Sequence, residues 1–444
     1  MTETTQEHAV DHAATAPAAV SLDTSSTPGA GGDVARDLRS MGKIVPGTGQ
    51  SEQHGFIAHA HGPSIPAQSR AERVSSFDAD AFAVPTGREE DWRFTPIDHL
   101  GALMSPAPSD DGAGTVTVSA PESVVHTEVS LDATRTAGAF IPTDRAAAVA
   151  FASVPSATLV RIPSDAELPE PVRVAVRAQG GLRFNHHLVI EAGRHSSAIV
   201  LLDHTGSTMH AGNVEIRVGE GAHLTVVSMQ RWDDESVHLA QHDVLVGRDA
   251  SVKHVAVTLG GRIVRLATNV RFAGPGGNAV LLGAFFADAG QHQEHRSFID
   301  HAEPRCASNV TYKGALQGDE AHSVWVGDVL VRAAAEGTDS YELNRNLVLT
   351  DGARADSVPN LEIETGEIIQ AAHASATGRF DDLQLFYLQS RGVPEEEARR
   401  LVVRGFFADV IHQIGVPDVQ DLLMAAIEEE LTASMYTATP QAVS

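Results

Sequence analysis

Between residues 191 and 275 the sequence repeats one kind of turn four times: Glu191-Ala192-Gly193-Arg194, Arg217-Val218-Gly219-Glu220, Leu245-Val246-Gly247-Arg248 and Phe272-Ala273-Gly274-Pro275. The glycines of these turns are 26, 28 and 27 residues apart. Five residues after each glycine stands an apolar residue, in turn Ala198, Leu224, Val252 and Ala279. Repeats of about 20 to 50 residues are typical of solenoids and propellers, so this period indicates a chain built from similar stacked units.

A unit of about 27 residues fits one coil of a β-solenoid with two or three short strands, whereas a propeller blade needs about 40 residues. From 115 to 378, short runs of Val, Ile, Leu and Thr alternate with Gly, Asp, Asn and Pro, which is the pattern of strands and turns. We therefore predict a mainly β fold in which small inward residues of each coil stack on the next coil and bury a continuous core. An ordinary β-sandwich with accidental spacing remains the alternative.

The segments around this region have a different texture. Residues 1–70 are rich in small and polar residues without an apolar period, which predicts a flexible leader. Residues 71–114 carry helix formers and predict a small helical N-terminal domain, with Trp92 as a packing anchor. From 379 to 432 apolar residues recur at spacings of three and four, which predicts a C-terminal helical domain. Residues 433–444 are predicted to be a flexible tail.

Composition and charge exclude several classes of partner. The chain has 444 residues, with 32 Lys plus Arg and 58 Asp plus Glu, and its formal net charge is −26. A surface this acidic repels phosphate backbones and anionic lipids, which argues against nucleic acid or a membrane as a main partner. No apolar run approaches the roughly 18 residues of a spanning helix, and the acidic N-terminus is unlike a signal peptide. We expect a soluble, cytoplasmic protein.

The sequence shows no motif of a common enzyme class. It contains no G-x-x-x-x-G-K-[ST], H-E-x-x-H, C-x-x-C or G-x-S-x-G pattern. The only lysines are Lys43, Lys253 and Lys313, and none stands in a phosphate-binding loop, so the chain is not expected to hydrolyse ATP itself. The single cysteine, Cys306, excludes an internal disulfide framework and a Cys-rich metal site built from one chain.

Histidines are candidates for metal binding. His292, His295, His301 and Cys306 form the densest group, and imidazole and thiolate can together bind zinc or iron. His292 and His295 have opposite parity, however, so one straight strand cannot aim both inward. We therefore favour surface histidines over a metal site, and we expect Cys306 to be a small buried thiol. His373 is surrounded by small residues, but on pattern alone a lone histidine is more often a structural residue than a ligand.

Several motifs occur in a fixed order along the chain. They are Pro359-Asn360-Leu361-Glu362-Ile363, His373, Gly378, Phe386-Tyr387-Leu388-Gln389-Ser390-Arg391-Gly392, Ala398-Arg399-Arg400-Leu401 and Gly405-Phe406. Together they resemble the C-terminal half of the SufB/SufD family of iron–sulfur cluster assembly proteins. Glu89-Glu90-Asp91-Trp92-Arg93-Phe94-Thr95 is similar to the N-terminal E-x-W-R-[YF]-T segment of the SufD branch. The match runs from about residue 80 to 430. The single cysteine also favours the SufD branch, because SufB members usually carry several.

The resemblance implies a right-handed parallel β-helix flanked by helical domains, which agrees with the repeat. It implies a non-catalytic scaffold subunit of a cytosolic complex, which pairs through its β-helix with a SufB-like paralog and docks a SufC-like ABC ATPase through its C-terminal helices. The residues expected in the docking region are Phe386, Tyr387, Leu388, Arg391, Gly392, Leu401, Gly405 and Phe406. No cofactor is expected to be bound stably by the chain alone, and a transient iron–sulfur cluster is expected in the complex.

The resemblance also gives His373 a role. Family members place a histidine at the matching position, at the interface with SufB, as a proposed iron or cluster ligand, and neutral imidazole suits iron. Some members carry a cysteine two residues earlier, where this chain has Ala371. A thiol from this subunit is therefore not expected at that site.

Two other functions remain open. A β-helix carbohydrate-active enzyme would line one solenoid face with carboxylates and aromatic residues, but the chain has only three Trp and four Tyr and no paired-carboxylate motif. A free-standing metal-binding protein would use the group from His292 to Cys306.

Overall fold

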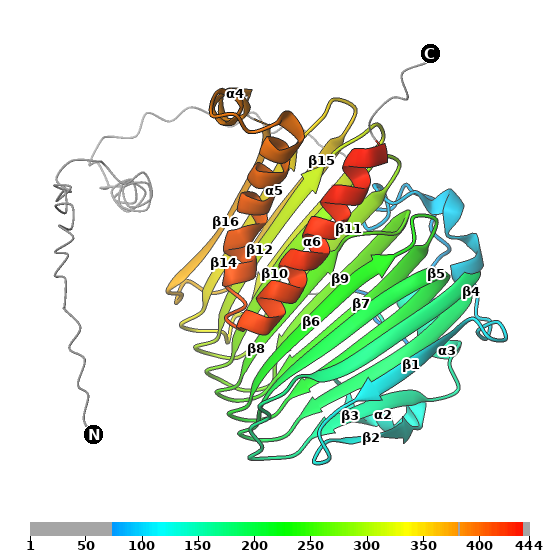
Figure 1. The fold of residues 1–444 in the computed structure, drawn as a ribbon. Coiled ribbons are helices and arrows are strands. Elements are labelled where there is room, and N and C mark those ends of the chain that lie inside the picture. Colours follow the sequence, from blue (N-terminus) through cyan, green and yellow to red (C-terminus); the bar gives the residue numbers. More distant parts are fainter. Residues whose placement is uncertain (1–72, 381, 438–444) are drawn as a thin grey trace, which may run out of the picture. The chain divides into compact units, whose positions relative to one another are not determined.

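The computed structural model describes residues 73–380 and 382–437. Most strands run parallel to the strands one coil before and one coil after them, and together they form a solenoid (Figure 1). The hydrogen-bonded order is β15-β13-β11-β9-β7-β5-β6-β8-β10-β12-β14-β16. Even-numbered strands from β6 onward form one layer, which we call sheet A, and odd-numbered strands from β7 onward form the other, sheet B. This agrees with the mainly β, parallel solenoid that the repeat predicts.

The long strands β4 (Val172–Ala192) and β5 (Ser197–Val218) contribute their first halves to sheet A and their second halves to sheet B. Sheet A continues with β6 (His223–Trp232), β8 (Ser251–Thr258), β10 (Asn278–Ala287), β12 (Ala307–Leu316), β14 (Asp339–Val348) and β16 (Gln370–Arg379). Sheet B continues with β7 (Val237–Val246), β9 (Ile263–Phe272), β11 (His292–His301), β13 (His322–Val331) and β15 (Arg354–Ile363).

Three strands and two α-helices of the described chain precede β4. They are β1 (Gly114–Ser119), β2 (Val125–Val129), α2 (Leu131–Ala137), α3 (Arg145–Ala152) and β3 (Ala157–Ile162). The strands β1 and β2 pair antiparallel, with β4 and β3 respectively. Parallel pairing therefore starts at β3, later in the chain than the predicted boundary at 115.

The sequence repeat corresponds to the stacking of coils. Four inward residues are successive partners along sheet A and are all buried: Ala198, Leu224, Val252 and Ala279. The turn glycines lie where neighbouring coils come closest. A Cβ atom added to Gly219 would be 2.8 Å from the carbonyl oxygen of Ala192 in the preceding coil. Parallel strands in this register exclude the β-sandwich alternative.

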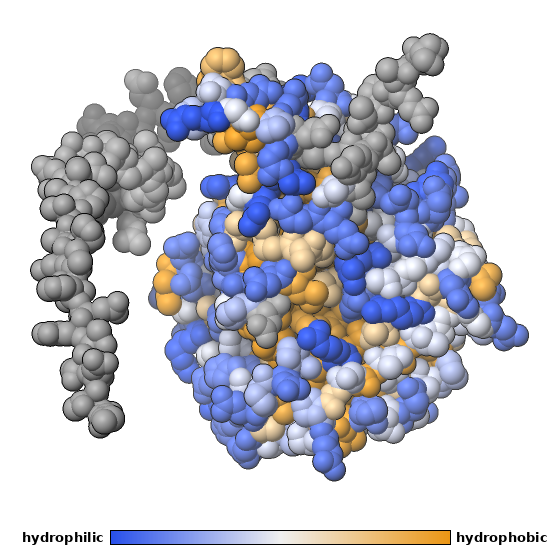
Figure 2. Space-filling view, in the orientation of Figure 1, coloured by the Kyte–Doolittle hydropathy of each residue, from blue (hydrophilic) through white to orange (hydrophobic). Residues whose placement is uncertain are grey.

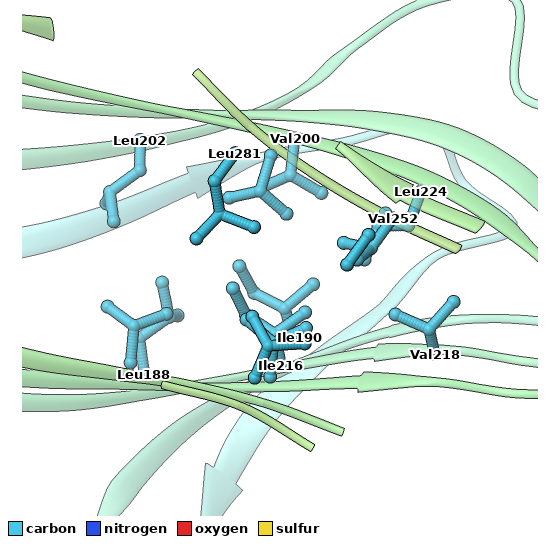
Figure 3. Close-up of a cluster of buried hydrophobic side chains, with 14 of the residues drawn as sticks. Leu188, Ile190, Val200, Leu202, Ile216, Val218, Leu224, Val252 and Leu281 are labelled. Atoms are coloured by element: carbon cyan, nitrogen blue, oxygen red, sulfur yellow. The ribbon is translucent and has the colours of Figure 1, made fainter. Parts of the chain in front are cut away.

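Branched aliphatic side chains fill the space between the two sheets (Figure 3). Val200, Leu202 and Leu281 of sheet A face Leu188 and Ile190 of sheet B, and all are almost fully buried. Each such side chain contributes about 1.5–3 kcal/mol when it is removed from water. Because every coil buries its inward residues against the next, this core runs through the solenoid without a break between coils.

Two C-terminal helices cover the outer face of sheet A (Figure 1). They are α5 (Glu395–His412) and α6 (Pro417–Thr437), and their apolar faces pack on outward residues of β6, β8, β10 and β12. Lys253 of β8 donates hydrogen bonds to the carbonyl oxygens of Gln413 and Ile414, at 2.7 and 2.9 Å, just after α5 ends. Lys313 of β12 donates to the carbonyl oxygen of Phe406 at 3.0 Å and pairs with Asp409. Two of the three lysines in the chain thus attach α5 to sheet A.

Residues 73–104 and α3 cover the outer face of sheet B. The segment holds three single-turn 3-10 helices, η2 (Ala79–Ala81), η3 (Ile97–His99) and η4 (Gly101–Leu103). Trp92 is buried, and the guanidinium of Arg265 lies 4.0 Å from its ring centre. The hydroxyl of Thr95 donates to the buried carboxylate of Glu294 at 2.7 Å. Where a separate helical domain was predicted, this segment packs on the solenoid, because its apolar side chains have sheet B as their core.

The C-terminal helices begin and end near the predicted signals. Helix α4 (Asp382–Ser390) is followed by Gly392, whose φ is +86°, and Pro394 directly precedes α5. Helix α6 extends to Thr437 and thus into the predicted tail. The whole predicted leader, residues 1–70, and residues 438–444 lie outside the described residues. No helix in the described part of the chain is both long enough and apolar enough to span a membrane.

Candidate functional site

The last coil, formed by β15 and β16, ends both sheets. Within the described chain each strand has a hydrogen-bonded neighbour on one side only, β13 for β15 and β14 for β16. Successive residues of a parallel strand direct their backbone groups to opposite sides. The N–H groups of Arg354 and Gln370 donate hydrogen bonds to the preceding coil, to the carbonyl oxygens of Ala321 and Thr338. The odd-numbered residues of β15 and β16 therefore direct their backbone groups to the open edge.

Pro359 stands at one of these odd positions in β15. Its missing N–H costs no hydrogen bond to β13, which explains why a proline is tolerated inside this strand. The other odd residues of the two strands present N–H and C=O groups at the edge. Two adjacent open edges of this kind are a surface on which another chain can continue both sheets.

The interior of the solenoid becomes polar as it approaches this edge. Asn344 and Asn346 point inward from β14, and the amide nitrogen of Asn346 donates to the amide oxygen of Asn344 at 2.8 Å. The same nitrogen contacts the hydroxyls of Ser357, at 3.1 Å, and Thr377, at 3.3 Å. Ser357 in turn donates to Asn344 at 2.7 Å. This network joins β14, β15 and β16 by side chains, so polar contacts add to the backbone bonds that hold the last coil.

Glu342 is a buried carboxyl group in this polar end. It is 1% exposed, and its Oε1 atom has no hydrogen-bond partner among the described residues. Burial, with a smaller contribution from the charge of Asp328, raises the pKa of Glu342 to about 8. Gly327 leaves room for it, since a Cβ atom there would lie 2.9 Å from Oε2 of Glu342 and 2.4 Å from the Trp325 ring. The interior therefore holds a carboxyl group that is protonated at neutral pH.

His373 lies in β16, on the open coil, and its side chain is exposed. Its Cα partner in β14 is Glu342, so both side chains belong to the same inward column. No hydrogen bond joins His373 to another described residue. Ala371 occupies the same strand face two residues earlier. A ligand or a partner chain at the open edge can thus reach an imidazole whose nitrogen atoms are free to bind.

The C-terminal helices present a second exposed surface. Phe386 and Tyr387 of α4 are 69% and 56% exposed, and the guanidinium of Arg391 lies 4.9 Å from the ring centre of Tyr387. Figure 2 shows hydrophobic surface in the region that α4 occupies in Figure 1. Large exposed apolar side chains next to an arginine are typical of protein-binding sites.

The other predicted docking residues divide between surface and core. Leu388 is half-buried, and Gly392 is exposed at the end of α4. On α5, Leu401 is 39% exposed and Gly405 is exposed. Phe406 packs partly against the outer face of sheet A, with the Lys313 ammonium 4.9 Å from its ring centre.

The histidines of β11 do not form a metal site with Cys306. His292 and His295 lie on opposite faces, as their parity predicts, but the predicted surface position is wrong because His292, His295 and His301 are all buried. The residues 73–104 cover the outer face, and the solenoid interior holds the rest. His292 contacts Glu294 at 3.2 Å, His295 contacts Thr258 at 2.9 Å and His301 contacts Ser308 at 2.9 Å. Cys306 is buried, as expected.

Sequence reasoning missed Glu342 and the interior asparagines. Val310, Glu342 and His373 are successive partners along sheet A, at spacings of 32 and 31 residues. The coils are therefore longer here than the 27-residue period of the first coils, so the repeat could not be followed by its spacing. A search for charged residues at inward positions of a slowly lengthening repeat would have found Glu342.

Comparisons with known proteins identify the family to which this chain is similar. Residues 175–406 match the family model described as "SUF system FeS cluster assembly, SufBD core domain". An iron–sulfur cluster assembly SufBD family protein of Mycobacterium tuberculosis is 54% identical over 378 residues, which cover 84% of this chain and 95% of that protein. The iron–sulfur cluster assembly protein SufD of Escherichia coli is 25% identical over 250 residues, 56% of this chain and 59% of that protein. The SufD protein of Bacillus subtilis is 26% identical over 282 residues, 61% of this chain and 63% of that protein.

The raised pKa of Glu342 predicts a pH-dependent effect of Glu342→Gln. Between about pH 5 and about pH 7.5 the folded chain keeps this proton and the unfolded chain loses it, so the wild-type contribution to stability falls as pH rises. We expect the variant to gain stability relative to wild type by on the order of 1 kcal/mol per pH unit over this range. Urea unfolding at several pH values measures it, with the exposed Glu122→Gln as control. Parallel curves for the variant and the wild type would contradict the assignment.

Proposed function

Because the chain belongs to the SufBD family of iron–sulfur cluster assembly proteins, we propose that it is a non-catalytic, SufD-type scaffold subunit of a cytoplasmic assembly complex. It pairs with a SufB-like paralog through the open edge of its solenoid. It docks a SufC-like ATPase through its C-terminal helices. The complex holds a transient iron–sulfur cluster as cargo, and the isolated chain holds none.

The observation that carries the pairing proposal is the open coil. The strands β15 and β16 each have ten residues with one free side, and both sheets end in the same coil. A second solenoid placed there continues two sheets at once and covers the polar interior around Asn344 and Asn346. A partner that shares the fold provides strands at the spacing this requires, which favours a paralog over an unrelated protein.

The docking proposal is supported by the exposed apolar surface of α4 together with the way the helices are attached. Helix α4 starts three residues after β16 ends, so a force on α4 acts on the edge strand through a short connection. Helix α5 is held on sheet A by Lys253 and Lys313. A partner that moves these helices when it binds nucleotide would therefore shift the open coil. The absence of a phosphate-binding loop in this chain fits an ATPase supplied by another subunit.

His373 is the residue of this chain that we propose as a ligand to iron or to the nascent cluster. Its imidazole is exposed on the coil that would meet the paralog, and imidazole is a sound ligand for iron. The remaining ligands would come from the partner, because Ala371 supplies none and Cys306 is buried two coils away, next to the start of β12. The role of this chain is thus to position one ligand and to close the edge of the site.

A proline in the edge strand separates pairing from folding. Ser375 of β16 directs its N–H to the open edge, so Ser375→Pro removes an edge donor without breaking a bond to β14. We expect the variant chain to lose the SufB-like paralog on co-purification, keep the ATPase, and change in stability by less than about 1 kcal/mol. The matched control, Ser375→Ala, keeps the N–H and keeps the paralog. Full pairing by the proline variant would overturn the edge proposal.

A charged residue introduced into the exposed apolar surface of α4 tests whether this surface binds the ATPase. Phe386→Asp is expected to weaken binding of the ATPase by about 2 kcal/mol, or roughly thirtyfold in Kd, because a large exposed aromatic side chain is a typical interface anchor. Binding of the paralog is expected to be unchanged. The control is Val125→Asp, which changes an exposed apolar residue of β2 far along the chain. Calorimetry with the purified ATPase measures both, and equal affinities for both variants would argue against docking at α4.

Removal of His373 is expected to lower the cluster content without dissolving the complex. His373→Ala deletes the imidazole, and the edge keeps its backbone groups. Iron and acid-labile sulfide in the co-expressed complex are expected to fall several-fold, while the subunit ratio stays the same. The exposed His223→Ala is the control. Unchanged iron and sulfide in an intact His373→Ala complex would remove this residue from the site.

A further inference from the structure

Three histidines converge inside the first coils, far along the solenoid from the open edge. His186 belongs to the second half of β4, and His204 and His210 belong to β5 on either side of its bend from sheet A to sheet B. One ring nitrogen of each lies within 4.8 Å of those of the other two, and all three side chains are buried. Among the described residues this is the only group of three metal-ligating side chains with such spacing.

Backbone carbonyl groups orient two of the three rings. Nδ1 of His204 lies 2.9 Å from the carbonyl oxygen of Met229, and Nδ1 of His210 lies 2.7 Å from that of Phe184. A carbonyl oxygen only accepts hydrogen bonds, so in both rings Nδ1 carries the proton and Nε2 carries the lone pair. This is the arrangement in which protein imidazoles bind metal ions, with the second nitrogen held by a hydrogen bond.

The rings are also in the charge state that a metal ion requires. Burial lowers the pKa of His204 to about 4 and that of His210 to about 3. Burial and the neighbouring histidines lower the pKa of His186 well below its ordinary value. Burial thus favours the neutral form of all three rings.

Packing alone does not explain why the polar ring of His186 is buried. It is 6% exposed, and neither of its ring nitrogens has a hydrogen-bond partner among the described residues. Nε2 of His210 also lacks a partner. Burying a polar group without a partner destabilises the folded chain, so an unfilled cluster of this kind is a net loss of stability. An ion bound by these nitrogens removes that loss.

Gly212 keeps the space beside these nitrogens open. A Cβ atom at this position would lie 2.5 Å from Nε2 of His210 and 2.9 Å from Nδ1 of His186. Any other residue at position 212 would therefore push into the place where the two rings meet. The glycine is needed for room and not for backbone conformation, since its φ is not positive.

We propose that His186, His204 and His210 form a binding site for one divalent first-row transition metal ion, with Zn²⁺ as the expected occupant. Three neutral imidazoles are a known donor set for zinc, and such sites bind zinc more tightly than iron(II). A tetrahedral zinc ion needs its nitrogens about 3.3 Å apart, so the rings close by on the order of 1 Å when it binds.

A three-histidine site leaves a fourth position for water. His238 is the polar neighbour there, with its ring centre 4.7 Å from that of His210. Its Nδ1 accepts a hydrogen bond from the indole N–H of Trp232 at 3.0 Å, so the proton of the neutral ring is on Nε2. His238 therefore offers no free lone pair to the ion and is not counted among the ligands.

The site is independent of the proposed scaffold function and departs from the expectation that the isolated chain binds no cofactor. It involves no residue of the open edge or of the helices. A purely structural role is the competing explanation, because the rings of His186 and His210 stack at 4.9 Å with an interplanar angle of 21°. Metal content and cobalt absorption distinguish a bound ion from an aromatic stack without an ion.

The test uses the full-length chain purified without partners. Metal content by mass spectrometry is expected to give about one zinc per chain and no acid-labile sulfide. After unfolding with a chelator, refolding with Co²⁺ is expected to produce the visible absorption of four-coordinate cobalt, which Zn²⁺ displaces. His186→Phe and Gly212→Ala are both expected to reduce bound metal by about tenfold or more.

Two control variants test whether the loss of metal is specific to the three-histidine site. His295→Phe replaces another buried interior histidine, stacked on Phe285, and is expected to keep the metal. His373→Ala is also expected to keep it, which separates this ion from any cluster at the open edge.

If the variants fail to fold, X-ray absorption of the wild-type chain still reports the ligands, with three imidazole nitrogens expected. Iron in place of zinc under iron-rich growth would correct the expected occupant. A wild-type chain without cobalt absorption, or equal metal in His186→Phe, would overturn the site.

Discussion

The stacking of one coil on the next is the constraint on which the rest of the structure depends. No coil buries its inward side chains alone, so each residue of the column Ala198, Leu224, Val252 and Ala279 needs the same kind of residue one period later. The stack must also stop somewhere, and the coil that ends it presents two strand edges at once. In this chain that coil is the one with a polar interior, a proline at an edge position and an exposed histidine. The same register that builds the core thus determines where a partner of the same fold can add to it.

The outer faces of both sheets are covered by other segments of the chain, whereas the edge of the last coil is open. Sheet A lies under α5 and α6, and sheet B lies under residues 73–104 and α3, so neither face is open for a large partner along the first coils. The outer face of sheet B carries charged as well as apolar side chains. Burial alone would raise the pKa of Glu294, but the hydrogen bond from His292 and the positive charges of Arg265 and Arg296 hold it far below its usual range. Arg265 lies over the ring of Trp92 and Arg296 pairs with Asp91, so these charges also hold the N-terminal segment on sheet B. Among the C-terminal helices, α4 carries the largest exposed aromatic side chains.

The candidate site was predictable in part. The motifs around Pro359, His373 and Phe386 pointed to both surfaces, and the structure places Phe386, Tyr387 and Arg391 on an exposed face. Phe406 was not separable from them by sequence, because its apolar ring packs on sheet A although its neighbour Gly405 is exposed. In the segment predicted as a small helical N-terminal domain, the helices are single 3-10 turns, because sheet B supplies the core on which its apolar side chains pack. Glu342 was missed because the coil length changes from about 27 to about 31 residues before it.

The sequence by itself determined the coil. A period in glycine and small apolar residues is a local property, and it dictates which side chains alternate inward and where turns must be narrow. What only the tertiary structure decided is which polar residues are buried. His292 and His295 have opposite parity, which the sequence shows, yet both are buried: His292 lies on the outer face that residues 73–104 cover, and His295 lies inside the solenoid against Thr258 and Phe285. His186, His204 and His210 likewise meet because β4 and β5 bend at the same corner. Strand alternation fixes the direction of a side chain, whereas its environment depends on what the rest of the chain brings against it.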